Sequence, residues 1–107
     1  MGTEESTWSG VFEALSDTTR REVLLALRDE NPRGLAELTR VIGGPGVAPA
    51  RMRVSLVHNH VPRLVEGGYV VWDREADRLW RGPDWPALEP VLDVVADEWV
   101  GAPRGPA

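Results

Sequence analysis

The side chains best suited to bind a partner lie in a stretch of the chain without carboxylates. Between Leu38 and Val65 there is no Asp or Glu, although the 107-residue sequence has 17 acidic residues against 12 basic ones and a net charge of −5. All the basic residues are arginines, and this stretch contains Arg40, Arg51, Arg53 and Arg63. Guanidinium groups clustered away from acids indicate a surface for an anionic partner, and we expect double-stranded DNA. The negative total charge opposes DNA binding, so the local charge must outweigh it.

Residues 51–65 are predicted to form one helix with a polar and an apolar face. At helical spacing the polar surface consists of Met52, Ser55, Asn59 and Arg63, with Arg51, Leu56 and His58 on its flanks. The stripe expected to face the core consists of Val54, Val57, Val61, Leu64 and Val65. Asn can pair with an adenine edge, Ser with either partner, and Arg with guanine or phosphate. Together with Arg53, the polar surface supplies the predicted DNA-binding residues of this helix, and the alternative is an ordinary solvated face.

Catalysis and metal binding are not expected. Ser55 and His58 are helical neighbours, but no acid lies near them in sequence, and a helix surface provides neither a water-excluding pocket nor an oxyanion hole. The chain has no cysteine, which excludes disulfides and thiolate metal sites. We therefore predict no catalytic residue, no cofactor and no metal.

Three shorter helices are predicted before the polar one. Trp8, Val11, Phe12 and Leu15 fall at i, i+3, i+4 and i+7, which is typical of an amphipathic helix. Ser16 is the expected N-cap of a second helix over residues 17–29. A third helix over residues 35–42 ends at a glycine-rich loop, and the fourth spans about 49–66.

A β-hairpin is predicted after the fourth helix. Residues 69–73 and 78–81 are rich in β-branched and aromatic side chains, and Trp72 and Trp80 are expected to pair across the two strands. Arg74, Arg78 and Arg81 are candidate contacts to phosphates or a minor groove. Acidic residues alternate with these arginines, so a solvated turn with ion pairs is an equally good interpretation.

Two residues of the fourth helix, His60 and Pro62, are interpreted separately from its two faces. His60 lies beside the apolar stripe, where a hydrogen-bonded packing histidine is a better interpretation than a base reader or ligand. Pro62 cannot donate a hydrogen bond to the carbonyl of His58. A kink is therefore expected near Pro62.

The order of elements is four helices, a β-hairpin and a last helix. This order predicts a mainly α fold with a small β-hairpin, the winged helix-turn-helix. The segment Ala14-Leu-Ser-Asp-Thr-Thr-Arg20 resembles the Ala-Leu-x-Asp-x-x-Arg run that begins the second helix of ArsR-type regulators. Residues 56–73 resemble the recognition helix and wing entry of the same family. Within them, His60-Val-Pro-Arg-Leu64 is similar to the His-Leu-Pro-x-Leu variant of winged-helix domains in haloarchaea.

The resemblance implies a transcription regulator that binds double-stranded DNA as a homodimer. The first and last helices of each subunit are expected to form the dimer interface. The last helix is predicted from Pro86 or Pro90 to Val100. The predicted interface residues are Trp8, Val11, Phe12, Leu88, Val91, Leu92, Val95 and Trp99. The rival hypothesis is a protein-interaction module that has kept the winged-helix fold without DNA affinity, and the net charge of −5 favours it.

We expect one domain over residues 7–100, with flexible termini at residues 1–6 and 101–107. The N-terminus is polar and acidic, and no apolar run approaches the ~18 residues of a membrane span. The sequence therefore predicts a cytoplasmic protein without a membrane partner.

Overall fold

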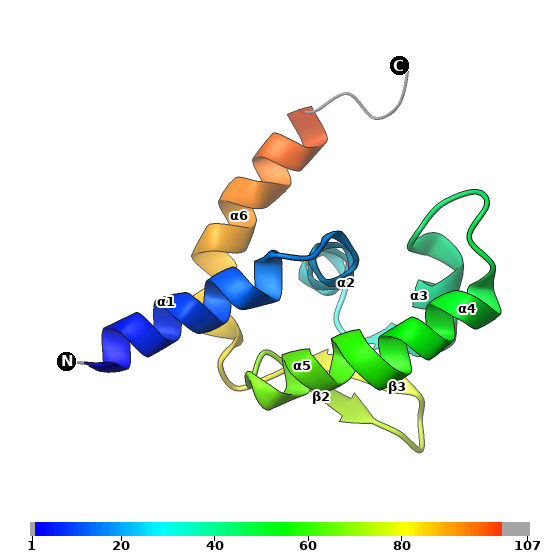
Figure 1. Ribbon diagram of the computed structural model, residues 1–107, viewed down its shortest axis with the longest axis horizontal. Coiled ribbons are helices and arrows are strands. Elements are labelled where there is room, and N and C mark those ends of the chain that lie inside the picture. The colour runs from blue at the N-terminus through cyan, green and yellow to red at the C-terminus, as the bar shows by residue number, and fades with distance from the viewer. Residues whose placement is uncertain (1, 102–107) are drawn as a thin grey trace.

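The computed structural model describes the backbone of residues 2–101 and the side chains of residues 8–98. Its helices are α1 (Gly2–Leu15), α2 (Thr18–Asp29), α3 (Leu35–Val41), α4 (Pro49–Ser55), the π-helix η1 (Leu56–His60), α5 (Val61–Glu66) and α6 (Trp85–Gly101). Its strands are β1 (Arg33–Gly34), β2 (Val70–Asp73) and β3 (Arg78–Arg81). Figure 1 shows α4, η1 and α5 as one continuous rod beside the hairpin of β2 and β3. The predicted mainly α fold with a small hairpin is confirmed.

The predicted hairpin belongs to a three-stranded antiparallel sheet with the order β1-β3-β2. Strand β1 was not predicted, because two residues, Arg33 and Gly34, carry no strand pattern. In the hairpin Val71 lies opposite Trp80, and Trp72 lies opposite Leu79. Since successive side chains of a strand point to opposite faces, Trp72 and Trp80 lie on different faces of the sheet. The prediction that these two tryptophans pair is wrong.

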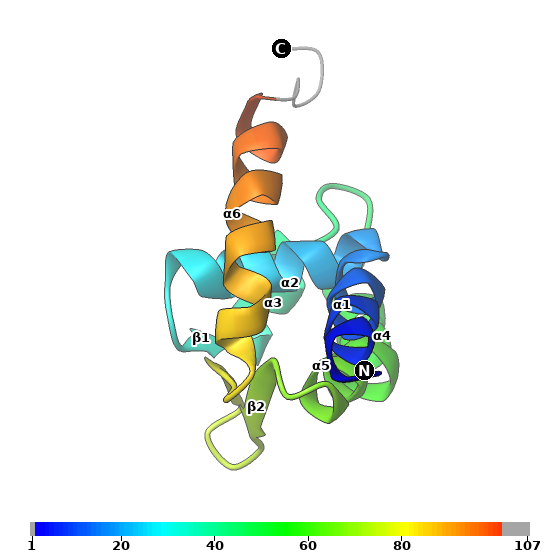
Figure 2. The ribbon, with the colours of Figure 1, turned by 90° about the vertical axis from the view of Figure 1, so that its left-hand side faces the viewer.

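The core lies where α1, α2, α3, α6 and the rod of α4, η1 and α5 meet the inner face of the sheet. Its fully buried side chains are Val11, Val23, Leu24, Leu27, Leu35, Leu38, Leu56, Val61, Leu64, Leu79, Leu88 and Leu92. Helix α2 contacts both α6 and β3, and α5 contacts β2. In Figures 1 and 2 the second half of α6 extends beyond the rest of the molecule, on the side away from the hairpin.

Asp17, rather than Ser16, is the N-cap of α2. Its Oδ1 accepts hydrogen bonds from the backbone N–H groups of Thr19 at 2.8 Å and Arg20 at 3.2 Å. Ser16 instead donates its hydroxyl hydrogen to the carbonyl of Glu13, at the end of α1. Both residue types cap helices well, so composition alone did not decide between adjacent positions.

Helix α1 already begins at Gly2, five residues before the predicted start of the domain at residue 7. Met1 and residues 102–107 of the predicted flexible termini lie outside the described residues. Within the described part of the chain, no helix combines the length and apolar character needed to cross a bilayer.

Candidate nucleic-acid interface

The rod that carries the candidate site contains a π-helical turn at its centre. The N–H of Val61 donates to the carbonyl of Leu56, five residues earlier, instead of the four of an α-helix. Pro62 follows directly, and its ring nitrogen has no hydrogen to donate. The irregularity expected from Pro62 is thus present as a wider turn in the backbone just before it.

The π-turn changes which residues face the core. Counting five residues back from Val61 and then four gives Leu56 and Met52, which are 0% and 8% exposed. A regular helix would place Val54 on the core-facing side instead, yet Val54 is 59% exposed. The extra residue in the turn shifts the phase of the stripe before it. The predictions that Met52 and Leu56 lie on the DNA-binding face, and that Val54 faces the core, are therefore wrong. The prediction that Val65 faces the core is also wrong: Val65 lies after the π-turn and is 40% exposed, whereas its neighbour Leu64 is buried.

The remaining candidates of the rod are accessible. Arg51, Arg53, His58, Asn59 and Arg63 are exposed, and Ser55 is half-buried. Arg74 and Arg78 of the hairpin are also exposed. The structure thus brings these predicted residues to the surface of the rod and of the adjacent hairpin, which we call the wing. Arg81 is half-buried and donates to the backbone carbonyls of Leu27 and Arg28, so the prediction that it contacts DNA is wrong.

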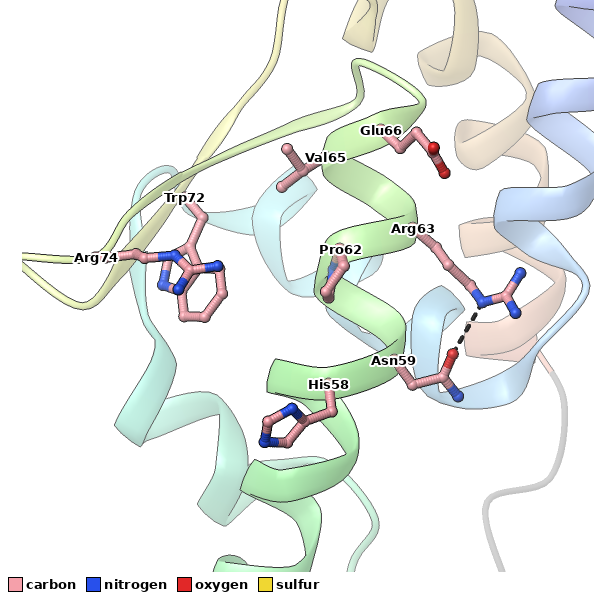
Figure 3. Close-up of a pocket in the computed structure, with 8 residues that line it drawn as sticks. All are labelled: His58, Asn59, Pro62, Arg63, Val65, Glu66, Trp72 and Arg74. Carbon is pink, nitrogen blue, oxygen red and sulfur yellow. Dashed lines mark hydrogen bonds between the residues drawn. The ribbon is translucent and has the colours of Figure 1, made fainter.

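A cleft of about 630 Å³ lies between parts of the rod and the wing. Figure 3 shows His58 and Pro62 on the rod side and Trp72 and Arg74 on the wing side. The Arg74 guanidinium lies 4.2 Å from the centre of the Trp72 ring, a cation–π contact. This contact holds a positive charge at the edge of the cleft.

Carboxylates from other elements reach two of the four arginines in the acid-free stretch. Arg53 donates from both terminal nitrogens to Asp77, at 3.1 Å each, and this contact raises the pKa of Arg53. Arg63 donates to Glu13 of α1 at 3.1 Å. Among the described residues Arg40 and Arg51 show no ion pair. The partners lie 24 and 50 residues away in the sequence, so the composition of the stretch did not reveal them.

A buried polar cluster attaches the rod to the junction of α1 and α2. Arg20 is 7% exposed and donates to the carbonyl of Glu13 and to the hydroxyl of Ser16. Its guanidinium also lies 3.3 Å from Nδ1 of His60, and Asp17 lies 3.8 Å from the same nitrogen. The interpretation of His60 as a hydrogen-bonded packing histidine is confirmed. The Asp-x-x-Arg spacing supplies both the cap of α2 and this brace.

The cluster affects two titrations. Burial lowers the pKa of His60 from its ordinary 6.5; the Asp17 carboxylate acts in the opposite direction, and Arg20 and Arg63 lower it further. For Asp17, burial acts to raise the pKa. Hydrogen bonds from the backbone of Arg20 and Thr19, and the charges of His60 and Arg20, outweigh it and lower this pKa from 3.8. The cluster therefore favours a neutral His60 beside an ionised Asp17.

The predicted dimer-interface residues divide between the surface and the core. Trp8 and Phe12 are 51% and 60% exposed, and their rings stack with centroids 5.7 Å apart. The prediction is wrong for three residues that are buried within the chain itself: Val11, Leu88 and Leu92.

Helix α6 carries apolar residues on two sides. Leu88, Leu92 and Ala96, four residues apart, face the core, whereas Val91 and Val95 are half-buried. Val94 is 63% exposed and was missed, because the predicted stripe merged the two sides. The side chain of Trp99 lies outside the described residues.

No group of three or more His, Cys, Asp or Glu side chains suited to a metal ion occurs among the described residues. The guanidinium groups of the rod and wing carry positive charge, so they are suited to binding an anionic partner rather than a metal ion.

The helices, the hairpin and the position of the rod beside the hairpin define a winged helix-turn-helix protein. The chain belongs to the family described as a domain of unknown function (DUF7344), whose model matches residues 12–79. A solved structure described as an ArsR family transcriptional regulator is similar, with a TM-score of 0.58 and 23% sequence identity, over 96% of this chain and 100% of that one. At this identity the likeness shows the fold. A search of curated proteins found no match.

Proposed function

We propose that this protein is a transcription regulator that binds specific double-stranded DNA sequences as a homodimer. The observation that carries the proposal is the exposed polar face of the rod, whose residues 49–65 include no carboxylate, beside an arginine-bearing wing. A helix of this kind fits the major groove, and a flanking hairpin can reach the backbone or the minor groove. Likeness to an ArsR family transcriptional regulator supports the same function. So does the similarity of residues 60–64 to the haloarchaeal motif. A DNA regulator would act in the cytoplasm.

Two groups of residues carry different parts of the binding. His58 and Asn59, exposed at the centre of the rod, are proposed to contact base edges, with half-buried Ser55 beside them. Arg51, at the beginning of the rod, and Arg74 and Arg78, on the wing, are proposed to contact phosphates. Phosphate contacts position the protein, whereas base contacts select the sequence.

The homodimer is proposed to form through α1 and α6. The stacked pair of Trp8 and Phe12 exposes two large aromatic side chains, and Val94 exposes an apolar one on α6. Adjacent exposed apolar side chains are typical of contact surfaces, and tryptophan is enriched among the residues that dominate binding energy. A two-fold dimer would present two rods to half-sites about one DNA turn apart.

The test is selection of bound sequences from random duplex DNA, followed by affinity measurements at several salt concentrations. With about four to six phosphate contacts per dimer, log K should fall against log salt with a slope of roughly −4 to −5. Asn59→Ala should relax the preference at particular base pairs, whereas Arg51→Ala should weaken all sequences alike.

Arg28→Ala is the matched control. Arg28 is an arginine outside the rod and wing, and it pairs with Asp93 of α6. Its removal should leave DNA affinity unchanged. If no sequence is enriched and affinity does not respond to salt, the proposal is refuted.

One observation favours the second candidate, a protein-interaction module. Asp77 and Glu13 pair with Arg53 and Arg63, so acids interrupt the positive surface. A monomer in sedimentation that does not bind DNA would support this candidate.

A further inference from the structure

We propose that Glu13 is a positioning residue for base recognition: through Arg63 it fixes the amide of Asn59 so that Asn59 selects guanine over adenine. This inference rests on the proposed DNA-binding function and goes beyond it. Glu13 lies on α1, and it would act on the DNA sequence without touching DNA.

Three residues form a chain across two helices. The carboxylate of Glu13 accepts a hydrogen bond from Nη1 of Arg63 at 3.1 Å. Nε of the same arginine donates to Oδ1 of Asn59 at 2.9 Å. Figure 3 shows the side chains of Asn59 and Arg63 linked by this bond and pointing to the side of the rod opposite His58; all three residues line the cleft.

The backbone of Glu13, the first residue of this hydrogen-bonded series, is held by a buried arginine. Arg20, 7% exposed, donates to the backbone carbonyl of Glu13 at 3.0 Å. It also lies against His60 of the rod. The end of α1 is therefore held against the rod, and this places the Glu13 backbone where its side chain reaches Arg63.

The chemistry of the two groups sets the direction of the amide. The Nε of arginine can only donate, so Asn59 must turn its oxygen toward Arg63 and its NH₂ group away. A free asparagine offers an acceptor and a donor together, which matches the N6 and N7 of adenine. Arg63 uses one of the two lone pairs of this oxygen and leaves the NH₂ group turned away from itself, so Asn59 offers the base edge its two donors in preference to its oxygen. Two donors match the two acceptors of guanine, O6 and N7.

The experiment compares four proteins: wild type, Glu13→Ala, Asn59→Ala and the double variant. The base pair read by Asn59 is the one at which Asn59→Ala loses its preference in selection from random duplexes. Dissociation constants are then measured on two duplexes that differ there by guanine or adenine. We expect wild type to prefer guanine by about fivefold or more.

Glu13→Ala should reduce or reverse this ratio, and it should have no further effect on the ratio in the Asn59→Ala background. A purely structural role of Glu13 would change stability or affinity without changing the ratio. Thermal unfolding of each variant shows that the fold is kept.

Asp77→Asn is the matched control, because it also removes a carboxylate from an arginine of the rod. That arginine is Arg53, which donates to Asp77 rather than to Asn59. The guanine-to-adenine ratio should stay at the wild-type value in this variant.

Three results would overturn the inference alone: adenine preferred at the Asn59 position, additive effects of Glu13→Ala and Asn59→Ala on the ratio, or an equal gain in affinity for all sequences in Glu13→Ala. The last result would mean that Glu13 merely keeps Arg63 from phosphates. If wild type selects no sequence at all, the proposed function and the inference fail together.

Discussion

The ion pair between Arg53 and Asp77 leads to a prediction about how strongly the protein binds DNA. Asp77 accepts two hydrogen bonds from Arg53 and so competes with a phosphate for the same guanidinium. Asp77→Asn removes this competing charge. The change suits the backbone, because Asp77 has φ 57 and asparagine adopts the left-handed region readily. The bond from Leu35 N–H to the Asp77 carbonyl does not involve the side chain.

The magnitudes follow from exposure and from counterion release. The side chains of Arg53 and Asp77 are 45% and 34% exposed, so the pair contributes only about 0–1 kcal/mol to stability. Each arginine that gains a phosphate contact adds about −0.9 to the salt slope, or roughly −1.8 for a two-fold dimer. When salt is lowered from 1 M to 0.1 M, the affinity of Asp77→Asn should therefore rise by roughly 60-fold more than that of wild type.

The assay is fluorescence anisotropy of labelled duplexes over a range of salt concentrations, with a selected sequence and an unrelated one. Both affinities should rise by a similar factor, since phosphates carry no sequence information. Asp93→Asn, which frees Arg28 outside the rod, should change neither. Weaker binding by Asp77→Asn would show that Asp77 orients Arg53 toward DNA, and an unchanged slope would show that Arg53 meets no phosphate. Either result refutes the reasoning.

Three other predictions test the core, the cluster and the dimer. Leu56→Ala should lower the free energy of unfolding by about 3 kcal/mol or more and the melting temperature by roughly 10 °C or more. Val54→Ala should change the free energy of unfolding by no more than about 0.5 kcal/mol. Equal effects of the two variants in thermal unfolding would contradict the π-turn register. The lowered pKa of His60 means that its contribution to stability is present above about pH 6.5 and is lost as the pH falls through the folded-state pKa, so His60→Gln should flatten stability against pH in this window. A double alanine replacement of Trp8 and Phe12 should shift sedimentation from dimer toward monomer while helical circular dichroism is kept, and a wild-type monomer at micromolar concentration would remove the dimer model.

Local signals predicted the elements well, and the errors arose where a contact or an irregular turn acts across a distance. Helical periodicity and strand composition located nearly every helix and both hairpin strands. Periodicity then failed within the rod, because it assumes 3.6 residues per turn throughout, and the π-turn before Pro62 adds one residue. For this reason Leu56, predicted to be exposed, is buried, and Val54, predicted to be buried, is exposed.

The candidate site was predicted in part for a related reason. Sequence reasoning found the exposed His58, Asn59 and arginines, since side-chain chemistry and helical position are local properties. It did not find that Glu13 and Asp77 reach two of those arginines. Such pairings depend on how α1 and the wing pack against the rod, and no pattern within residues 38–65 encodes them.

The distribution of charge, rather than its total, decides whether an acidic protein can bind DNA. Helix α6 carries Glu89, Asp93, Asp97 and Glu98 and no basic residue. In Figures 1 and 2 it extends away from the rod and the hairpin, so much of the acidic excess lies on the far side of the molecule. DNA approaching from that side would be repelled, whereas the face with Arg51 would attract it. The net charge of −5 is thus compatible with a binding face that admits DNA from one direction.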